Sequence, residues 1–334
     1  MFLLQNGRGH SGTRMKIAII TPGSEPSLQG QVTGNEVTAQ RWEELLRKLG
    51  HDPVMLEQYE NEEADLLIAL HARKSSGSIE VFKASFPNKP LVVAMTGTDL
   101  YQDLPDDETV LRSLELATHI VVLQPGALDI LDRSLRPKTT VIYQSAQPIT
   151  RAITKAANCF QACLVAHLRE VKDPLLAAEA MALLPKTSRG QLVHAGAAGS
   201  SKMEKRATET ASKNTRYRWI GPVSHKEARL LIARSHILLL TSRSEGGANV
   251  LSEALILGTP ILASRVPGVE GLLGAYFPGY FPAGDARSLA TLLERAEHDD
   301  VFYRRLELAG EKLAAKVAPS RELDSWQELI DSLA

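Results

Sequence analysis

Short apolar runs alternate with amphipathic stretches along the first half of the chain. Each run has the length of a strand, and the stretches between the runs have the spacing of helices. Apolar runs of this kind, separated by helices, indicate a parallel sheet covered on both faces. A helix is also predicted from about Thr38 to Leu49, ending at Gly50. The predicted strands are Lys16–Ile20, Asp65–Leu70, Leu91–Met95, His119–Leu123 and Thr140–Tyr143.

A second alternating series begins after Gln147 and Pro148, which interrupt the first. Its predicted strands are Ala162–Ala166, Gln191–Ala195, Tyr217–Ile220, Ile237–Leu240 and Ile261–Ala263. The sequence therefore predicts an α/β protein of two Rossmann-like domains, residues 15–148 and 149–334, with a disordered leader over residues 1–14. Apolar residues at helical spacing predict an amphipathic tail helix over about residues 320–334.

Composition agrees with a two-domain globular protein, because 334 residues suffice for two separate cores. Lys and Arg (38) nearly balance Asp and Glu (39), so no overall charge favours nucleic acid or anionic lipid. No apolar run approaches the roughly 18 residues that span a bilayer. We expect a cytoplasmic protein that binds small molecules and neither nucleic acid nor membrane. Cys159 and Cys163, placed four apart on one predicted strand, are expected to stay reduced.

The most informative stretch runs from Ser244 to Pro260, where a glycine turn leads from a strand into a helix. A helix N-terminus suits phosphates because its first N–H groups are unpaired. Glu245 lies in the turn and Glu253 inside the helix, and ionised carboxylates accept hydrogen bonds from sugar hydroxyls. Alternatively, Glu245 caps the helix and Glu253 is a solvated helix residue. The predicted donor-binding residues are Glu245, Gly246, Gly247, Ala248, Asn249, Val250 and Glu253.

This stretch resembles glycosyltransferases of the two-domain GT-B fold, retaining family four in particular, because Glu253 is followed by Ala-Leu and then Gly-Thr-Pro. In that family an Arg and a Lys after the first strand of the second domain hold the donor diphosphate. Here His167 occupies the usual Arg position, Lys172 matches the Lys, and Arg169 is displaced by two. We expect Arg169 and Lys172 to clamp the diphosphate, because its charge must be neutralised as the glycosidic bond breaks. His167 is assigned to the donor site as well. The resemblance to GT-B proteins also implies that the tail helix crosses back onto the first domain.

The segment from Trp219 to His225 stands where this fold usually binds the nucleotide base through backbone groups. Gly221 and Val223 are therefore assigned to the base, and uracil suits such contacts. His225 has two possible roles, since it could belong to this segment of the donor site or equally cap the helix that follows.

Five polar segments follow strands of the first predicted sheet and therefore line the edge that faces the cleft. They are Gln29–Thr38, Ala69–Arg73, Met95–Tyr101, Leu123–Gln124 and Tyr143–Ser145. The first of them joins loop glycines to a helix start, which favours an anion. The predicted acceptor-binding residues are Gly34, Asn35, Thr96, Gly97, Thr98, Asp99, Gln124 and Gln144.

Together with segments of the second predicted domain, these five segments resemble the selenosugar synthases of selenoneine biosynthesis over nearly the whole chain from Met15 to about Leu293. The segments that carry the likeness include Thr33–Asn35, Ala69–Arg73, Thr96–Tyr101, Tyr143–Ser145, His167–Arg169 and Gly279–Pro282. One departure is Glu36, which stands where an Arg is expected. The resemblance implies sugar transfer from UDP-N-acetylglucosamine or UDP-glucose to the selenium of selenophosphate. It also implies catalytic roles for Lys172, Arg169 and His71.

Two other functions fit the same residues. The first is an ordinary glycosyltransferase with an organic hydroxyl or thiol acceptor, and the second is a non-catalytic nucleotide-sugar-binding protein. No cofactor and no metal are expected, because no His, Asp and Glu cluster has ligand spacing and a basic clamp can replace magnesium.

Overall fold

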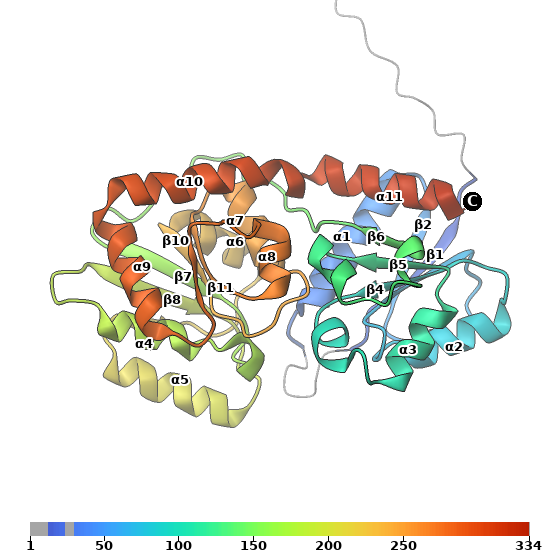
Figure 1. Ribbon diagram of the computed structural model, residues 1–334, viewed down its shortest axis with the longest axis horizontal. Coiled ribbons are helices and arrows are strands. Elements are labelled where there is room, and N and C mark those ends of the chain that lie inside the picture. Colours follow the sequence, from blue (N-terminus) through green and yellow to red (C-terminus); the bar gives the residue numbers. More distant parts are fainter. Residues whose placement is uncertain (1–12, 24–29, 334) are drawn as a thin grey trace, which may run out of the picture.

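The computed structural model describes residues 13–23 and 30–333, which form two lobes with one parallel sheet each (Figure 1). Most of the predicted leader, residues 1–12, lies outside the described residues. Every strand pair in both sheets is parallel, so each sheet has one edge at which its strands end. Within the described part of the chain, no helix is both long and apolar enough to cross a membrane.

The first sheet has the strand order β2-β1-β3-β4-β5-β6. Its strands are β1 (Lys16–Ile20), β2 (Asp52–Leu56), β3 (Leu66–Leu70), β4 (Leu91–Met95), β5 (His119–Val122) and β6 (Thr139–Val141). The strands β3 and β4 are buried at every position, as expected for a sheet covered on both faces. The helical segments of this domain are α1 (Gly34–Lys48), α2 (Ser76–Ser85), η2 (Asp99–Asp103), α3 (Glu108–Leu116), η3 (Pro125–Asp129) and η4 (Arg136–Lys138).

The second sheet has the strand order β12-β11-β10-β7-β8-β9. Its strands are β7 (Phe160–Val165), β8 (Gly190–Ala195), β9 (Tyr217–Trp219), β10 (Ile237–Leu240), β11 (Ile261–Arg265) and β12 (Tyr280–Pro282). The helical segments are η5 (Glu170–Lys172), α4 (Leu175–Leu183), α5 (Ser201–Lys213), α6 (His225–Arg234), α7 (Asn249–Leu257), α8 (Pro267–Leu273), α9 (Ala286–His298), α10 (Asp300–Ala314), η6 (Ala315–Val317) and α11 (Pro319–Leu333).

The structure corrects three details of the sequence prediction. Helix α1 begins at Gly34 rather than Thr38, because Thr33 and Glu36 form a capping box that starts the helix earlier. Cys159 precedes β7 instead of sharing a strand with Cys163, and both cysteines are free. The edge strands β2 and β12 were not predicted, since each is short and contains a proline.

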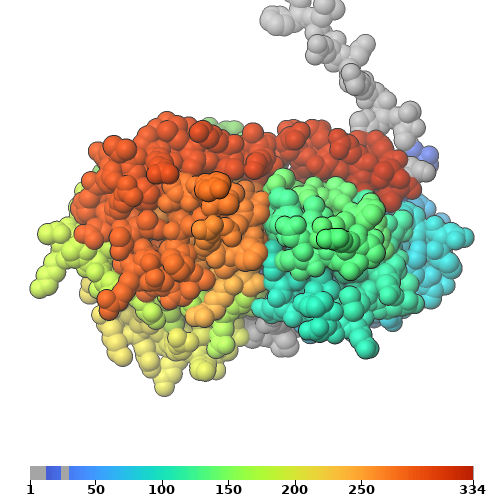
Figure 2. All heavy atoms as spheres, in the orientation of Figure 1, coloured from blue at the N-terminus to red at the C-terminus, as the bar shows by residue number. Residues whose placement is uncertain are grey.

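The final helix crosses back onto the first domain, as the fold prediction requires. Helices α10 and α11 run along one side of both lobes (Figures 1 and 2). Helix α10 packs against α7 of the second domain, whereas α11 packs against α1 of the first. Trp326 of α11 is fully buried, and its ring lies 4.8 Å from that of Trp42.

A buried carboxylate fixes this last helix to the first domain. Glu322 of α11 has a side chain with no exposed surface. It accepts hydrogen bonds from Arg41 Nε and Trp42 Nε1, both at 2.8 Å. Ser145, in the loop after β6, donates its backbone N–H at 2.8 Å and its hydroxyl at 2.5 Å to the same carboxylate. Four donors from two segments therefore satisfy one buried charge.

Replacing Glu322 with Ala should lower the free energy of unfolding by about 3 kcal/mol, because it leaves the Arg41 charge buried without its partner. Urea unfolding followed by tryptophan fluorescence measures this change, since Trp42 and Trp326 are both buried beside the substitution. Glu328→Ala, at an exposed position of the same helix, is the matched control. Equal unfolding midpoints for the two variants would contradict this account of the interaction.

Candidate active site

The strand ends of the two sheets face a shared cavity of about 620 Å³, a volume typical of small-molecule sites. From the first domain it is lined by residues that include Val32, Gly34, Asn35, His71, Lys74, Thr96, Gly97, Thr98 and Gln144. From the second domain it is lined by residues that include His167, Arg169, Lys172, Val223, His225, Glu245, Gly246, Gly247, Ala248, Asn249, Val250 and Glu253. Of the predicted site residues, Gly221, Asp99 and Gln124 are not among the lining residues.

Helix α7 starts at the wall of this cavity. Its N-cap is Ala248, and no side chain makes a capping hydrogen bond there. Leu251 donates its N–H to the carbonyl of Ala248, so the N–H groups of Asn249 and Val250 are the ones left for another acceptor. Because this end also carries partial positive charge, it is suited to an anion such as a phosphate.

Glu245 lies beside this helix start but does not cap it, so the capping alternative for Glu245 is wrong. Its carboxylate is 5% exposed and accepts from Lys172 Nζ at 2.7 Å and from Ser242 Oγ at 2.5 Å. Both bonds end on Oε1. The Lys172 ammonium has three N–H donors, so one bond to Glu245 leaves two for phosphate oxygens. Arg169 is the N-cap of the short η5 helix and Lys172 is its last residue, and both cations line the cavity.

Glu253 faces the same cavity from inside α7 and is likewise buried, which excludes the solvated alternative. Its Oε1 lies 2.5 Å from His225 Nε2. The N-cap of α6 is Ser224, which forms a capping box with Glu227. His225 therefore is not the cap of that helix but a partner of Glu253. Gly221 lies just outside the cavity, where its carbonyl accepts from the N–H of Gly196.

His167 contacts both domains. Its Nδ1 accepts from the backbone N–H of Ala197 at 3.1 Å, so the proton of the neutral ring is on Nε2. That nitrogen donates to the carbonyl of Val32 in the first domain at 3.1 Å. Burial lowers the pKa of His167, which favours the neutral ring. His167 thus bridges the cleft with a neutral side chain, whereas the family Arg would bring a charge.

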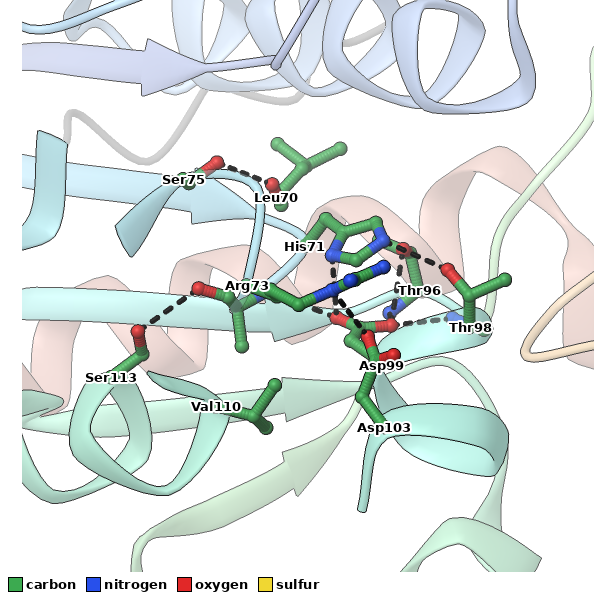
Figure 3. Close-up of polar contacts among 12 residues, drawn as sticks. Leu70, His71, Arg73, Ser75, Thr96, Thr98, Asp99, Asp103, Val110 and Ser113 are labelled. Carbon is green, nitrogen blue, oxygen red and sulfur yellow. Dashed lines mark hydrogen bonds and ion pairs between the residues drawn. The ribbon is translucent and has the colours of Figure 1, made fainter. Parts of the chain in front are cut away.

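On the first-domain wall, His71 directly follows β3, and its ring points toward Thr98 and Asp99 (Figure 3). His71 has a positive φ of 70°, and its Nε2 lies 2.8 Å from the Thr98 hydroxyl. Burial lowers the pKa of His71, and the nearby Asp99 carboxylate opposes this shift. A mostly neutral imidazole at neutral pH follows, in contact with a hydroxyl that lines the cavity.

Asp99 and Gln124 act behind this wall, which corrects their assignment to direct acceptor contact. Asp99 is fully buried and accepts from the backbone N–H groups of Ala72, Thr96 and Gly97 at 2.8–3.0 Å. It thereby fixes the loop after β4. Gln124 is also fully buried and donates to the Tyr101 hydroxyl at 2.6 Å. Both residues shape the wall without reaching the cavity.

Lys74 is a lining residue that the sequence prediction missed. Its charge opposes protonation of His71, so the two side chains are electrostatic neighbours. The sequence does hold a feature that could have identified Lys74, because this residue directly follows the segment Ala69–Arg73 at the end of a strand. Glu36, in contrast, does not line the cavity, because its carboxylate accepts from the N–H of Thr33 in the capping box.

No metal site is apparent among residues 13–23 and 30–333, since no group of three or more His, Cys, Asp or Glu side chains there could hold an ion. Among the described residues that line the cavity, the side chains of Lys74, Arg169 and Lys172 and the start of α7 supply positive charge.

A buried histidine supports the second-domain wall from beneath. His194 of β8 has no exposed surface, and its Nε2 donates to the carbonyl of Ala166 at 2.9 Å. Its Nδ1 accepts from the Tyr217 hydroxyl, also at 2.9 Å. Burial lowers the pKa of His194 to about 4. Ala166 and Gly196 line the cavity, and a Cβ on Gly196 would lie 1.9 Å from the Ala166 oxygen.

Acidification should destabilise the protein through His194. Its pKa falls from 6.5 to about 4 on folding, so the unfolded protein binds a proton at this ring more readily than the folded protein does. The stability that the neutral ring contributes is therefore fully present above pH 6.5 and is lost as the pH falls toward 4. Between about pH 7.5 and pH 5 this loss amounts to about 2 kcal/mol. Urea unfolding at both pH values should show a smaller loss of unfolding free energy in His194→Gln than in the wild type. His298→Gln, at an exposed position, is the control and should keep the wild-type pH dependence of the unfolding free energy. An unchanged pH dependence in His194→Gln would refute the role given to His194.

Comparison with solved structures confirms the predicted fold. Sucrose-phosphate synthase from Thermosynechococcus elongatus superposes with a TM-score of 0.79 at 17% identity, covering 96% of this chain and 99% of that one. The Anabaena protein HepE in complex with UDP-glucose gives a TM-score of 0.74 at 16% identity, covering 96% and 100%. At these identities the likeness concerns the fold alone, which is the GT-B arrangement of two Rossmann-like domains.

Sequence comparison gives the family. Glycosyltransferase 1 domain-containing protein 1 of Xenopus tropicalis is 24% identical over 272 residues, which are 72% of this chain and 77% of that protein. The family model described as "Glycosyl transferases group 1" matches residues 147–313, half of the chain, including η5, α7 and the donor side of the cavity. The chain therefore belongs to the group 1 glycosyltransferases.

Proposed function

We propose that this protein transfers N-acetylglucosamine or glucose from a UDP-sugar to the selenium of selenophosphate. The observation that carries the proposal is the composition of one cavity. Arg169, Lys172 and the uncapped start of α7 gather positive charge beside two buried carboxylates, Glu245 and Glu253. This combination suits a diphosphate joined to groups rich in hydroxyls.

The donor occupies the second-domain wall in this proposal. Arg169, Lys172 and the first N–H groups of α7 hold the diphosphate and stabilise UDP as it departs. Glu253 binds the ribose and Glu245 the sugar hydroxyls, while the backbone near Val223 contacts the base. Solved structures of similar fold support a UDP-sugar, since HepE was solved with UDP-glucose and the pneumococcal O-GlcNAc transferase GtfA with UDP and GlcNAc.

The acceptor occupies the first-domain wall, which suits a small anion. Lys74 supplies a cation there, and Gly34 and Asn35 form the first turn of α1. The expected Arg is replaced by Glu36, but the carboxylate of Glu36 is directed to the N–H of Thr33 and does not line the cavity. The residues that resemble selenosugar synthases, including His71 and Thr96 to Thr98, make up much of this wall.

The proposed reaction forms one C–Se bond. Selenium attacks C1 of the sugar, the bond from C1 to the diphosphate oxygen breaks, and UDP leaves. Water then cleaves the Se–P bond, which releases phosphate and the 1-selenosugar. Because selenium is already anionic, the protein supplies position and leaving-group stabilisation rather than a strong base. His71 would hold the acceptor through its contact with Thr98.

A hydroxyl or thiol acceptor is the second candidate, and the state of His71 favours it. Burial lowers the pKa of His71, so the ring is available to take up a proton from an attacking group. An organic acceptor would need such a base, whereas selenophosphate would not.

Mass spectrometry of products distinguishes these functions. The purified protein is incubated with UDP-N-acetylglucosamine or UDP-glucose, with and without freshly made selenophosphate. We expect a product with a selenium isotope pattern on a hexose or N-acetylhexosamine, formed together with UDP. UDP-sugar binding without a selenium product would refute the acceptor, and transfer to an added thiol or alcohol instead would establish the second candidate.

Substituting Lys172 by Ala should lower turnover by about two to three powers of ten, the effect of losing one group that stabilises developing charge. The release of UDP under saturating donor measures this. Lys186→Ala, at an exposed position outside the cavity, is the matched control. Turnover of Lys172→Ala within a few-fold of the control would remove Lys172 from the mechanism.

A further inference from the structure

A chain of polar contacts leads from the last helix to the start of α7. Arg41 of α1 donates through Nε to the buried carboxylate of Glu322 at 2.8 Å. Through Nη1 the same guanidinium donates to Asn249 Oδ1 at 2.9 Å. The Arg41 side chain is only 14% exposed. A planar guanidinium held at two points has little freedom, so Glu322 fixes where Arg41 meets Asn249.

The contacts of Asn249 determine the orientation of its amide. Arg41 can only donate, so the atom facing it must be the carbonyl oxygen Oδ1. Nδ2 then faces the first domain and donates to the carbonyl of Gly34 and the hydroxyl of Thr38, both at 3.1 Å. The side chain of Asn249 therefore contacts α1 across the cleft, whereas its position in the sequence predicts a contact with the donor.

These contacts join the two halves of the cavity at one point. Asn249 is the first residue of α7, the helix whose start is suited to the donor phosphates. Gly34 is the first residue of α1 and lines the first-domain wall. One amide thus fixes the distance between the two helix starts. If either helix start shifted, the bound groups would no longer be aligned, and a misplacement of about 1 Å can cost about a hundredfold in rate.

We propose that Arg41 is a positioning residue for sugar transfer, because it orients Asn249 so that the start of α1 is held against the start of α7. This inference rests on the proposed function for the identity of the two substrates. Arg41 itself does not line the cavity, so in this proposal it contacts neither substrate. Its role is exerted through Asn249.

Kinetics of two variants test the proposal. Asn249→Ala removes the bridge while leaving the Arg41–Glu322 pair in place. Arg41→Lys keeps a charge near Glu322 but lacks the fork that reaches two acceptors. Each should lower kcat by about ten- to a hundredfold, with UDP affinity by calorimetry unchanged within about twofold. Arg47→Lys, on an exposed face of the same helix, should match the wild type.

The double variant separates positioning from a merely structural role. If Arg41 acts through Asn249, the double variant has nearly the kcat of the slower single variant. If the double variant instead loses kcat by the product of the two single losses, the two residues act independently and the proposal is overturned. A normal kcat in both single variants would also overturn it. A loss of UDP affinity in parallel with kcat would also overturn it, because Asn249 would then be a donor-binding side chain only.

Hydrogen exchange with UDP alone gives a test that does not depend on the acceptor. UDP should slow amide exchange at the first turn of α7 and, through Asn249, at the first turn of α1. In Asn249→Ala the protection should persist at α7 and disappear at α1. Wild-type protein that shows both effects but makes no selenosugar would refute the acceptor and leave the positioning role standing. UDP binding without protection at α1 would refute the positioning role and leave the donor proposal intact.

Discussion

A carboxylate withdrawn from water needs hydrogen-bond donors on every side, and Glu322 is such a group. Its donors come from Arg41, Trp42 and Ser145, all of them in the first domain. The end of the chain is therefore tied to the first domain, while the preceding helix α10 packs on α7 of the second. Because α7 begins at the cavity, the burial of one charge outside the cavity wall contributes to how the two walls face each other.

Glycines make the close approach of these walls possible. A Cβ on Gly246 would lie 2.0 Å from the carbonyl oxygen of Thr96, and one on Gly247 would lie 2.6 Å from Leu123. A side chain at either position would push the loop before α7 away from the first domain. The turn that precedes the helix thus serves two purposes, since it leaves the N–H groups of α7 open and lets backbone meet backbone across the cleft.

Much of the donor side could be predicted because it depends on local pattern. The spacing of Glu245 and Glu253 around a glycine turn places both near the start of one helix, and this placement depends only on the local sequence. Asp99 and Gln124 show the limit of this reasoning, since a position after a strand indicates the edge of the sheet but not whether the side chain faces the cavity or lies beneath the loop. The direction of Asn249 depends on Arg41, 208 residues earlier in the chain, so local pattern could not reveal it.

The distribution of charge across the cavity bears on the chemistry that the site can support. Arg169 and Lys172 lie on the second-domain wall and Lys74 on the first. Burial lowers the pKa of both His71 and His167, which also line the cavity. Two anionic groups, one held at each wall, would therefore be balanced by these Lys and Arg side chains, because the neutral rings of His71 and His167 add no positive charge. An attacking atom that is already anionic needs only to be aligned beside Lys74, whereas a hydroxyl or thiol would have to give up its proton to a neutral ring such as that of His71.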